Sequence, residues 1–360
     1  MDKSQYFKDL KVIELASVLA GPSVGLFFSE LGAKVIKVEN KLSAGDVTRR
    51  WKLPEEDQDS PFSAYYYSIN WRKETMMMDL SDPVDLEVLL ELVKDADILI
   101  ANFKVGAAEK LGVGYQQLKA LNPKLIYASV NAYGESDPRP GFDVVVQAET
   151  GWIYMNGEAD GLPVKMPVAL MDVLAGHQLK EGVLLALLDR EKTGLGCSVS
   201  ISLFDTGIAS LANQATNWLN LQNIPKRMGS RHPNIAPYGD TFYTADKRAL
   251  IVSTGTARQW QDLCKVLGMP ELIKDPRFID NGQRLLNRDA LADALSRGFA
   301  SYQSDELMRI CEAGEIPIAP IRNMKEVFEM PAAKALVLEE TMPDGSISKR
   351  VQTAVFKISD

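Results

Sequence analysis

Short apolar runs alternate with longer segments of helical periodicity over the first 130 residues of the chain. Apolar runs predict buried strands at 12–16, 35–38, 75–78, 98–101 and 125–130. Between them, apolar residues recur at helical spacing, which predicts helices beginning at Pro22, at Pro83 and near Tyr115. Because strands and helices alternate, we expect a parallel, doubly wound α/β sheet.

The pattern changes near residues 223–229. Before this point it predicts helices over 143–154 and 172–188, a strand over 197–201 and a helix to about Leu219. After it come a hairpin, 240–243 and 250–253, three helical stretches near 257–267, 283–299 and 304–313, and short terminal strands at 349–352 and 354–358. We therefore expect a large α/β domain over 1–224 and a smaller α+β domain over 225–325.

Composition narrows the class of protein. The chain is 46% hydrophobic and 24% charged, with a net charge of −8, which argues against nucleic acid and anionic membranes as partners. It contains no signal-peptide core and no apolar run of about 18 residues. Cys197, Cys264 and Cys311 have neither metal-site nor disulfide spacing. These features predict a cytoplasmic protein.

The chain has only two histidines, His177 and His232. A histidine-rich metal centre is therefore not expected, and acid–base chemistry would depend mainly on carboxylates. Asp172 begins a long apolar helix, and Asp143 begins the helix before it. Each fits a helix N-cap or a chemical role, and local pattern alone favours the cap. His177, inside the apolar helix, is predicted to be a core histidine.

Two turns that follow predicted strands could bind a ligand. The first contains Gly21 and Gly25 but lacks the third glycine of a dinucleotide fingerprint, so nicotinamide binding is not favoured. In the second, Asn102 and Phe103 offer an amide and a stacking face, and Lys104 and Lys110 offer charge for a phosphate; an ordinary polar turn fits equally well. The glycine- and proline-containing loop 229–237 fits either a linker or an active-site cover.

Segments distributed over nearly the whole chain resemble one family of enzymes. They are 18–22, 30–39, 45–49, 102–106, 111–114, 121–127, 141–148, 172–176, 192–196, 202–205, 232–238, 259–260 and 275–278. Their order and number resemble the class III CoA-transferases (CaiB/BaiF), which include formyl-CoA:oxalate and carnitine CoA-transferases. The resemblance implies a Rossmann-like large domain to which residues 326–360 return, and an interlocked homodimer.

The resemblance also assigns the nucleophile. Asp172 stands where the family has its catalytic aspartate, which reverses the preference for a cap. Its carboxylate would attack an acyl-CoA thioester to give a mixed anhydride and CoA thiolate. The thiolate would then form an aspartyl-CoA thioester, and an acceptor carboxylate would take the CoA by the reverse steps. CoA and acyl-CoA are thus substrates, and no tightly bound cofactor or metal is expected.

Further residues are assigned by the same resemblance. The predicted CoA contacts are Ser17, Leu19, Ala20, Met78, Asn102, Phe103, Lys110 and Leu111. Asp143 would support the reaction, and Gly229, Arg231, His232 and Asn234 would belong to an active-site loop. Relatives often have arginine at the position of Lys110. The polar loop residues suggest a short or functionalised carboxylate substrate such as a dicarboxylate, while the absence of a glycine-run loop argues against oxalate.

Two alternatives remain open. The α-methylacyl-CoA racemases share this fold, but their Gly-His-Asp motif is Gly141-Phe142-Asp143 in this chain, and phenylalanine cannot transfer a proton. A CoA-binding protein without catalytic activity would retain the same fold. Retention of Asp172 and of the 229–237 loop favours the enzyme.

Overall fold

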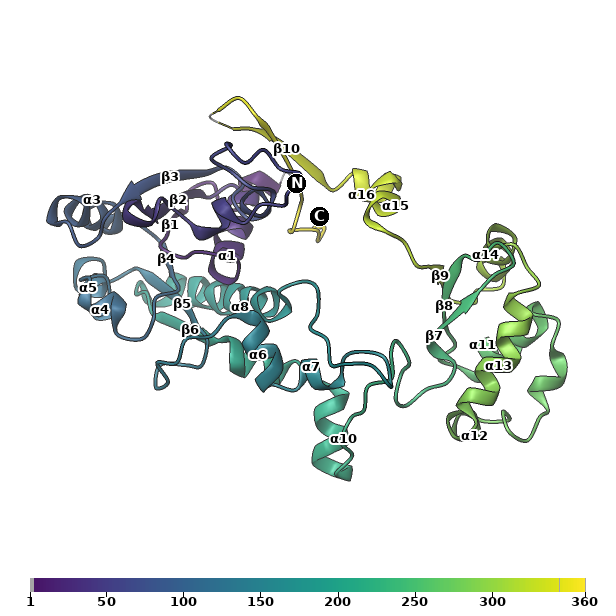
Figure 1. Cartoon of the computed structure of the whole chain (residues 1–360). Helices are drawn as coiled ribbons and strands as arrows, with labels where there is room; N and C mark the ends of the chain where they lie inside the picture. The colour runs from purple at the N-terminus through teal and green to yellow at the C-terminus, as the bar shows by residue number, and fades with distance from the viewer. Residues whose placement is uncertain (1–2, 343, 360) are drawn as a thin grey trace. The chain divides into compact units, whose positions relative to one another are not determined.

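The computed structural model describes residues 3–342 and 344–359, and internal contacts divide the chain into two units (Figure 1). The larger unit contains the residues up to 152, residues 165–224 and the residues from 334 onward. The smaller unit contains residues 153–164 and 225–333. Residues 153–164 thus leave the larger unit, pack with the smaller one and return.

A six-stranded sheet forms the centre of the larger unit. Its strands, in spatial order, are β3 (Lys73–Met78), β2 (Lys34–Asn40), β1 (Lys11–Glu14), β4 (Ile98–Ala101), β5 (Ile126–Asn131) and β6 (Ser198–Ser202). All neighbouring strands are parallel, which confirms the expected sheet. The strand order reverses direction between β1 and β4, and ligands of such sheets bind at the carboxyl ends of the strands beside this point.

Helices cover both faces of this sheet. Successive strand residues point to opposite sides, so each strand contributes side chains to both cores. Val12 and Ile100 pack into the core beneath α1 (Ala20–Glu30) and α8 (Leu170–Thr193). Ile13 and Leu99 pack into the core beneath α3 (Pro83–Lys94) and α5 (Tyr115–Leu121). Figure 1 shows these two pairs of helices on opposite faces of the sheet. Continuous apolar strands therefore carry two helical layers.

Shorter elements complete the larger unit. They are the 3-10 turns η1 (Lys3–Gln5), η2 (Lys41–Ser43) and η3 (Val47–Arg50), and the helices α2 (Ala64–Tyr67), α4 (Ala107–Lys110), α6 (Asp143–Glu149), α9 (Leu203–Ala209) and α10 (Asn213–Leu221). Helix α7 (Trp152–Met155) begins in the larger unit and continues into the segment 153–164 of the smaller unit. Two helices predicted to be continuous are each broken. Gly151, at φ 86°, separates α6 from α7, and Ala212, at φ 48°, precedes α10. Neither backbone conformation continues a right-handed helix.

The C-terminal segment forms one hairpin rather than the two strands predicted at 349–352 and 354–358. The hairpin pairs β10 (Val337–Thr341) with β11 (Ile347–Val351) in antiparallel register. The prediction of a strand at 354–358 is wrong, because the N–H groups of Thr353 and Ala354 donate to the carboxylate of Glu30 on α1 instead of to a strand. Arg350 also pairs with Glu30 at 2.9 Å.

The smaller unit has its own sheet and core. Its antiparallel strands are β7 (Tyr238–Tyr243), β8 (Ala249–Ser253) and β9 (Ile318–Pro320), and its helical elements are α11 (Ala257–Val266), η4 (Pro270–Ile273), α12 (Asn281–Leu286), α13 (Arg288–Phe299), α14 (Ser304–Ala313), α15 (Met324–Glu329) and α16 (Pro331–Lys334), which ends at the boundary of the units. The hairpin and the three helical stretches are confirmed, although 283–299 is divided at Asn287. Trp260, Phe278 and Phe299 lie in its core.

Candidate active site

Asp172 lies in the first turn of α8, two residues after the helix begins at Leu170. The N-cap is Ala169, whose side chain makes no capping hydrogen bond, so the interpretation of Asp172 as the cap is wrong. The Asp172 side chain is buried, with 7% exposed, and its carboxylate accepts a hydrogen bond from the N–H of Ala20. Ala20 is the first residue of α1, so the positive end of a second helix dipole faces the carboxylate.

Asp143 supplies the missing cap of α8 from another helix. It is the first residue of α6 and does not cap that helix, whose N-cap is Phe142. Its Oδ1 accepts from the N–H of Met171 at 2.7 Å, and its Oδ2 accepts from Nε2 of Gln147 at 2.6 Å. The Asp143 carboxylate thus accepts from a first-turn N–H of α8 that has no acceptor within the helix, one residue before Asp172.

The surroundings make Asp172 a more basic carboxylate than usual. Burial, and then the negative charge of Asp143, raise the pKa of Asp172 to about 7, while the hydrogen bond from Ala20 opposes this rise. Burial, together with the charges of Asp172 and Asp143, raises the pKa of Tyr65 to about 12, so this phenol remains protonated beside them. Near neutral pH Asp172 is therefore partly ionised and titrates within the physiological range.

Close packing of α1 against α8 depends on Gly176. A Cβ atom at this position would lie 2.1 Å from Oγ of Ser23 and 3.2 Å from the carbonyl oxygen of Ala20. Both distances are shorter than van der Waals contact, so a larger residue would push the two helices apart. Glycine here keeps the N–H of Ala20 within reach of Asp172.

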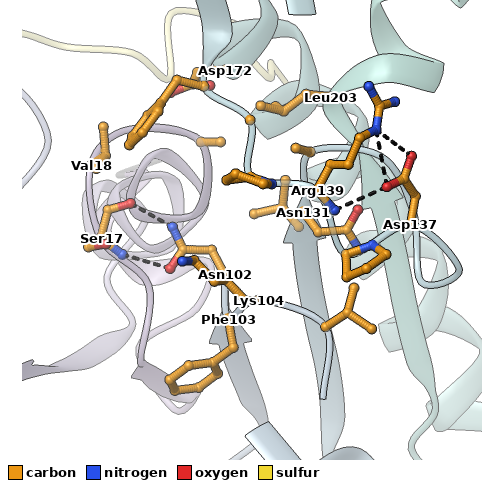
Figure 2. A pocket seen from close by; sticks show the side chains of 18 of the residues that line it. Ser17, Val18, Asn102, Phe103, Lys104, Asn131, Asp137, Arg139, Asp172 and Leu203 are labelled. Carbon is orange, nitrogen blue, oxygen red and sulfur yellow. Dashed lines mark hydrogen bonds and ion pairs between the residues drawn. The ribbon is translucent and has the colours of Figure 1, made fainter. Parts of the chain in front are cut away.

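The turn that leads into α1 is fixed from two sides. Asn102, which follows β4, accepts the N–H of Ser17 at 3.1 Å and donates to its carbonyl oxygen at 2.8 Å (Figure 2). Val18 has φ 71°, an unfavourable conformation for a β-branched residue. Its N–H donates to the carboxylate of Asp46. These bonds hold a strained turn immediately before the residue that contacts Asp172.

Asp46 belongs to a buried chain of charges under this turn. It pairs with Lys37 at 3.0 Å, Lys37 pairs with Glu14 at 2.9 Å, and Glu14 pairs with Lys73 at 2.7 Å. The side chains of Glu14, Lys37 and Lys73 have no exposed area. Each charge has an opposite partner, so the cluster is internally compensated and fixes the turn from below.

Two cavities of about 350 Å³ each lie in this part of the larger unit, and Asp172 lines one of them. The first, here the Ser17 cavity, is lined by Asp172, Ser17, Asn102 and Arg139 among others (Figure 2). The second, here the Lys180 cavity, is lined by the neighbours of Asp172 and Ala20, together with residues further along α8. Its lining includes Leu19, Tyr65, Val173, His177, Lys180 and Thr353. Of these two cavities, Asp172 itself lines the Ser17 cavity, and the next residue on α8, Val173, lines the Lys180 cavity.

The residues predicted to contact CoA fall into two groups. Ser17, Ala20, Asn102 and Phe103 line the Ser17 cavity with Asp172, and Leu19 lines the Lys180 cavity. Met78 is buried in the core, Leu111 packs against that core, and Lys110 is exposed at the end of α4 and lines none of the cavities described here. Lys104, in contrast, lines the Ser17 cavity. The CoA contacts remain predictions.

Sequence reasoning did not identify the roles of Tyr65, Arg139 or Lys180. Arg139 lines the Ser17 cavity and pairs with Asp137 and Glu149 at 3.0 and 3.1 Å. Its place just before Gly141-Phe142-Asp143 is a signal that could have indicated it. Lys180 follows Val173 by seven residues, and that helical spacing places both on one face of α8.

His177 does not lie in the core as predicted. It is exposed on α8 and lines the Lys180 cavity, so that prediction is wrong. Burial and the nearby Lys180 lower the pKa of His177. Its ring is consequently neutral at physiological pH.

The predicted loop residues lie in the smaller unit. Arg231 pairs with Asp240 at 3.2 Å and with Asp289 at 2.9 Å. His232 Nδ1 accepts the N–H of Asn234 at 3.1 Å. Gly229, at φ 60°, begins the loop. These contacts order the loop within its own unit, and its role as an active-site cover remains a prediction.

The described residues contain neither a candidate metal-binding cluster nor a membrane-spanning helix. In residues 3–342 and 344–359, no cluster of histidine, cysteine, aspartate or glutamate side chains could hold a metal ion. Across the same residues, no helix is both long and apolar enough to cross a membrane. Cys197, Cys264 and Cys311 are all free thiols.

Comparison with known proteins identifies close relatives over the full length. Residues 7–360 match the sequence profile of CoA-transferase family III. The chain is 35% identical to a succinate–glutarate CoA-transferase of Agrobacterium fabrum over 96% of this chain and 88% of that protein, and 33% identical to the Homo sapiens succinyl-CoA:glutarate CoA-transferase over 100% and 83%. A CaiB/BaiF family protein from Brucella suis superposes with TM-score 0.83 at 37% identity, over 98% and 92% of the two chains.

Proposed function

Because this chain belongs to CoA-transferase family III, we propose that it moves CoA from an acyl-CoA donor to a carboxylic acid acceptor, with Asp172 as the covalent nucleophile. The main support is the geometry of Asp172. Its carboxylate is buried, accepts from the N–H of Ala20 and lines the Ser17 cavity. Relatives are named for succinate, glutarate, mesaconate and oxalate, and all of these acids are dicarboxylates.

The reaction proceeds through acyl exchange on one carboxylate. An Asp172 oxygen attacks the thioester carbonyl, the carbon–sulfur bond breaks, and a mixed anhydride and CoA thiolate form. The thiolate attacks the aspartyl carbonyl, which gives aspartyl-CoA thioester and releases the donor acid. An acceptor carboxylate then attacks this thioester and expels CoA thiolate, which gives a second mixed anhydride. The thiolate attacks the acyl carbonyl of the acceptor, which forms the new acyl-CoA and regenerates the Asp172 carboxylate.

The two cavities divide the reactants. The thiol end of CoA enters the Ser17 cavity, where the hydroxyl of Ser17 can bond a pantetheine amide while Asn102 holds the backbone of Ser17 in place. The exchanging acids occupy the Lys180 cavity. The N–H of Ala20 donates to the Asp172 oxygen that becomes negative when thiolate or the acceptor carboxylate attacks the aspartyl carbonyl. Asp143 holds α8 in place through the N–H of Met171 and is not required to transfer a proton.

Intact-mass analysis after incubation with acyl-CoA tests this proposal. We expect a covalent CoA adduct on the wild-type chain, its loss on treatment with hydroxylamine, and localisation of the adduct to the peptide that contains Asp172. Asp172→Asn should form no adduct, because the amide oxygen is a much weaker nucleophile than a carboxylate. The exposed Asp293 provides a matched control, and Asp293→Asn should form the adduct normally.

The same samples distinguish the alternatives. Transfer of CoA at wild-type rate by Asp172→Asn would contradict the covalent mechanism. Exchange of the α-proton of a 2-methylacyl-CoA in D₂O without acyl transfer would support a racemase instead. Phe142, 61% exposed in the position before Asp143, has no proton to exchange, so no deuterium should be incorporated.

The assembly and the remaining residues follow the family pattern in this proposal. We expect a homodimer in which CoA also contacts Met78, Phe103, Lys110 and Leu111. Gly229, Arg231, His232 and Asn234 would cover the intermediate against water, which hydrolyses both anhydride and thioester. Increased hydrolysis of acyl-CoA by a loop variant such as His232→Ala, with the adduct still formed, is the expected result.

A further inference from the structure

Lys180 is an unusual buried charge. Only 9% of the residue is exposed, and it lies on α8 in the wall of the Lys180 cavity. Among the residues that the structure describes, no carboxylate forms an ion pair or hydrogen bond with its ammonium group. The Nζ atom lies 5.4 Å from the centroid of the Phe27 ring. Charged side chains are rarely buried without a partner of opposite charge.

Two other buried lysines of this chain show the contrast. Lys37 and Lys73 are fully buried, and both form ion pairs with Glu14 at less than 3 Å. Glu30 influences Lys180 only at longer range, and its oxygens are already occupied by Arg350, Thr353 and Ala354. Burial lowers the pKa of Lys180 accordingly. A negatively charged ligand would provide the partner that the chain itself does not.

The cavity extends from Lys180 to residues that lie next to Asp172 in the chain. Ala169, Val173, His177 and Lys180 follow one another along one face of α8, and Val173 directly follows Asp172. The helical rise places the Cα atoms of Asp172 and Lys180 about 12 Å apart. Side chains on a helix lean toward its N-terminus, so the lysine side chain shortens this distance. The lining between the two is mainly apolar.

We propose that the Lys180 cavity binds a linear dicarboxylate longer than oxalate, with one carboxylate at the end lined by Leu19 and Val173, next to Asp172, and the other paired with Lys180. This assignment rests on the proposed function, because it takes the acid that exchanges at Asp172 as the occupant. The apolar wall suits the methylene chain, and Thr353 and His177 line the cavity together with Lys180. Oxalate has its two carboxylates directly bonded and cannot reach both positions.

Glutarate and valerate are suitable probes, because their chains are equally long and only glutarate has a second carboxylate. Isothermal titration calorimetry should show tighter binding of glutarate to the wild-type protein. Lys180→Met removes the charge while keeping the length, and should weaken glutarate binding on the order of 100-fold with valerate unchanged. Lys180→Arg should retain most of the preference. Lys192→Met, an exposed change on the same helix, is the matched control.

Acceptor kinetics with one fixed acyl-CoA donor provide the second measurement. The ratio of kcat/KM for glutarate over valerate should fall on the order of 100-fold in Lys180→Met. Equal binding of the two acids by the wild-type protein, or parallel loss of both in Lys180→Met, would overturn the inference. Lys180-dependent glutarate binding without any CoA adduct on Asp172 would support this carboxylate site and contradict the proposed transferase mechanism.

Discussion

Replacing Asp172 by asparagine should stabilise this protein at alkaline pH. Asparagine has the same shape and keeps an oxygen to accept the N–H of Ala20, but it cannot become charged. The wild-type carboxylate has a pKa of about 7 in the folded chain against an ordinary value of 3.8, because burial and Asp143 disfavour its charge. The folded state therefore holds a proton that the unfolded state releases at lower pH.

The size of the effect follows from these two values. They differ by roughly three units, and each unit corresponds to about 1.4 kcal/mol, so ionised Asp172 costs the folded state about 4 kcal/mol. Below pH 3.8 both states are protonated and the cost is absent. It grows as the pH rises from 3.8 and is complete above about pH 7. Relative to wild type, Asp172→Asn should therefore gain stability across this interval.

Urea unfolding of both proteins between pH 4 and pH 8.5 measures this difference. Four of the five tryptophans, at 51, 71, 152 and 218, lie in the larger unit, so intrinsic fluorescence follows the unfolding of the unit that contains Asp172. The advantage of Asp172→Asn should grow by about 4 kcal/mol over the range. The exposed control Asp293→Asn should show no such growth. A difference that stays constant with pH would refute a raised pKa at Asp172.

Three further changes test the supports of the site. Asp143→Asn keeps an acceptor for the N–H of Met171 but removes a negative charge, so the acid limb of the pH profile of kcat/KM, which reports ionisation of Asp172, should move to lower pH. An acid limb at unchanged or higher pH would contradict the electrostatic role of Asp143. Gly25→Ala would place Cβ 1.9 Å from Oε2 of Glu14, which two lysines hold in place, so the free energy of unfolding in urea should fall by about 3 kcal/mol or more. Gly255→Ala, at a position with open space around it, is the control and should lower this free energy much less. Gly176→Ala should lower the free energy of unfolding by about 1–3 kcal/mol and slow adduct formation, and adding Ser23→Ala, which removes the nearest clashing atom, should restore part of the stability and of the rate. If neither recovers, Ser23 does not limit the approach of α1 to α8.

The sheet could be predicted because its signal is local. Strands buried on both faces are continuous apolar runs, and those at 98–101 and 125–130 were located to within a residue or two. The helix beginning at Pro83 was also located, since Pro83 at its first position and Asp82 as its cap are both sequence signals. The breaks at Gly151 and Ala212 were not, because the backbone conformation there depends on how the flanking helices pack.

The supports of the site could not be predicted, since each joins residues far apart in sequence. Asp143 caps a helix that begins 27 residues later, and Arg350 pairs with Glu30 across 320 residues. Glu14 and Lys73 meet only because their strands lie on either side of β2. Spacing along the chain contains none of this. Only the chain-wide resemblance identified Asp172, and local pattern favoured a cap that the structure does not show.

The burial of Asp172 also affects the free energy of the proposed acylation. A nucleophile that is ionised at neutral pH costs the folded chain up to about 4 kcal/mol through desolvation and repulsion from Asp143. The anhydride and thioester that it would form are both neutral, so acylation removes this cost. The same arrangement retains the N–H of Ala20 for the negative oxygen that forms when the aspartyl carbonyl is attacked. Burial that destabilises the free carboxylate thus favours its acyl derivatives, and the rigid supports from Asp143, Gly176 and Asp46 keep the carboxylate from moving out to water.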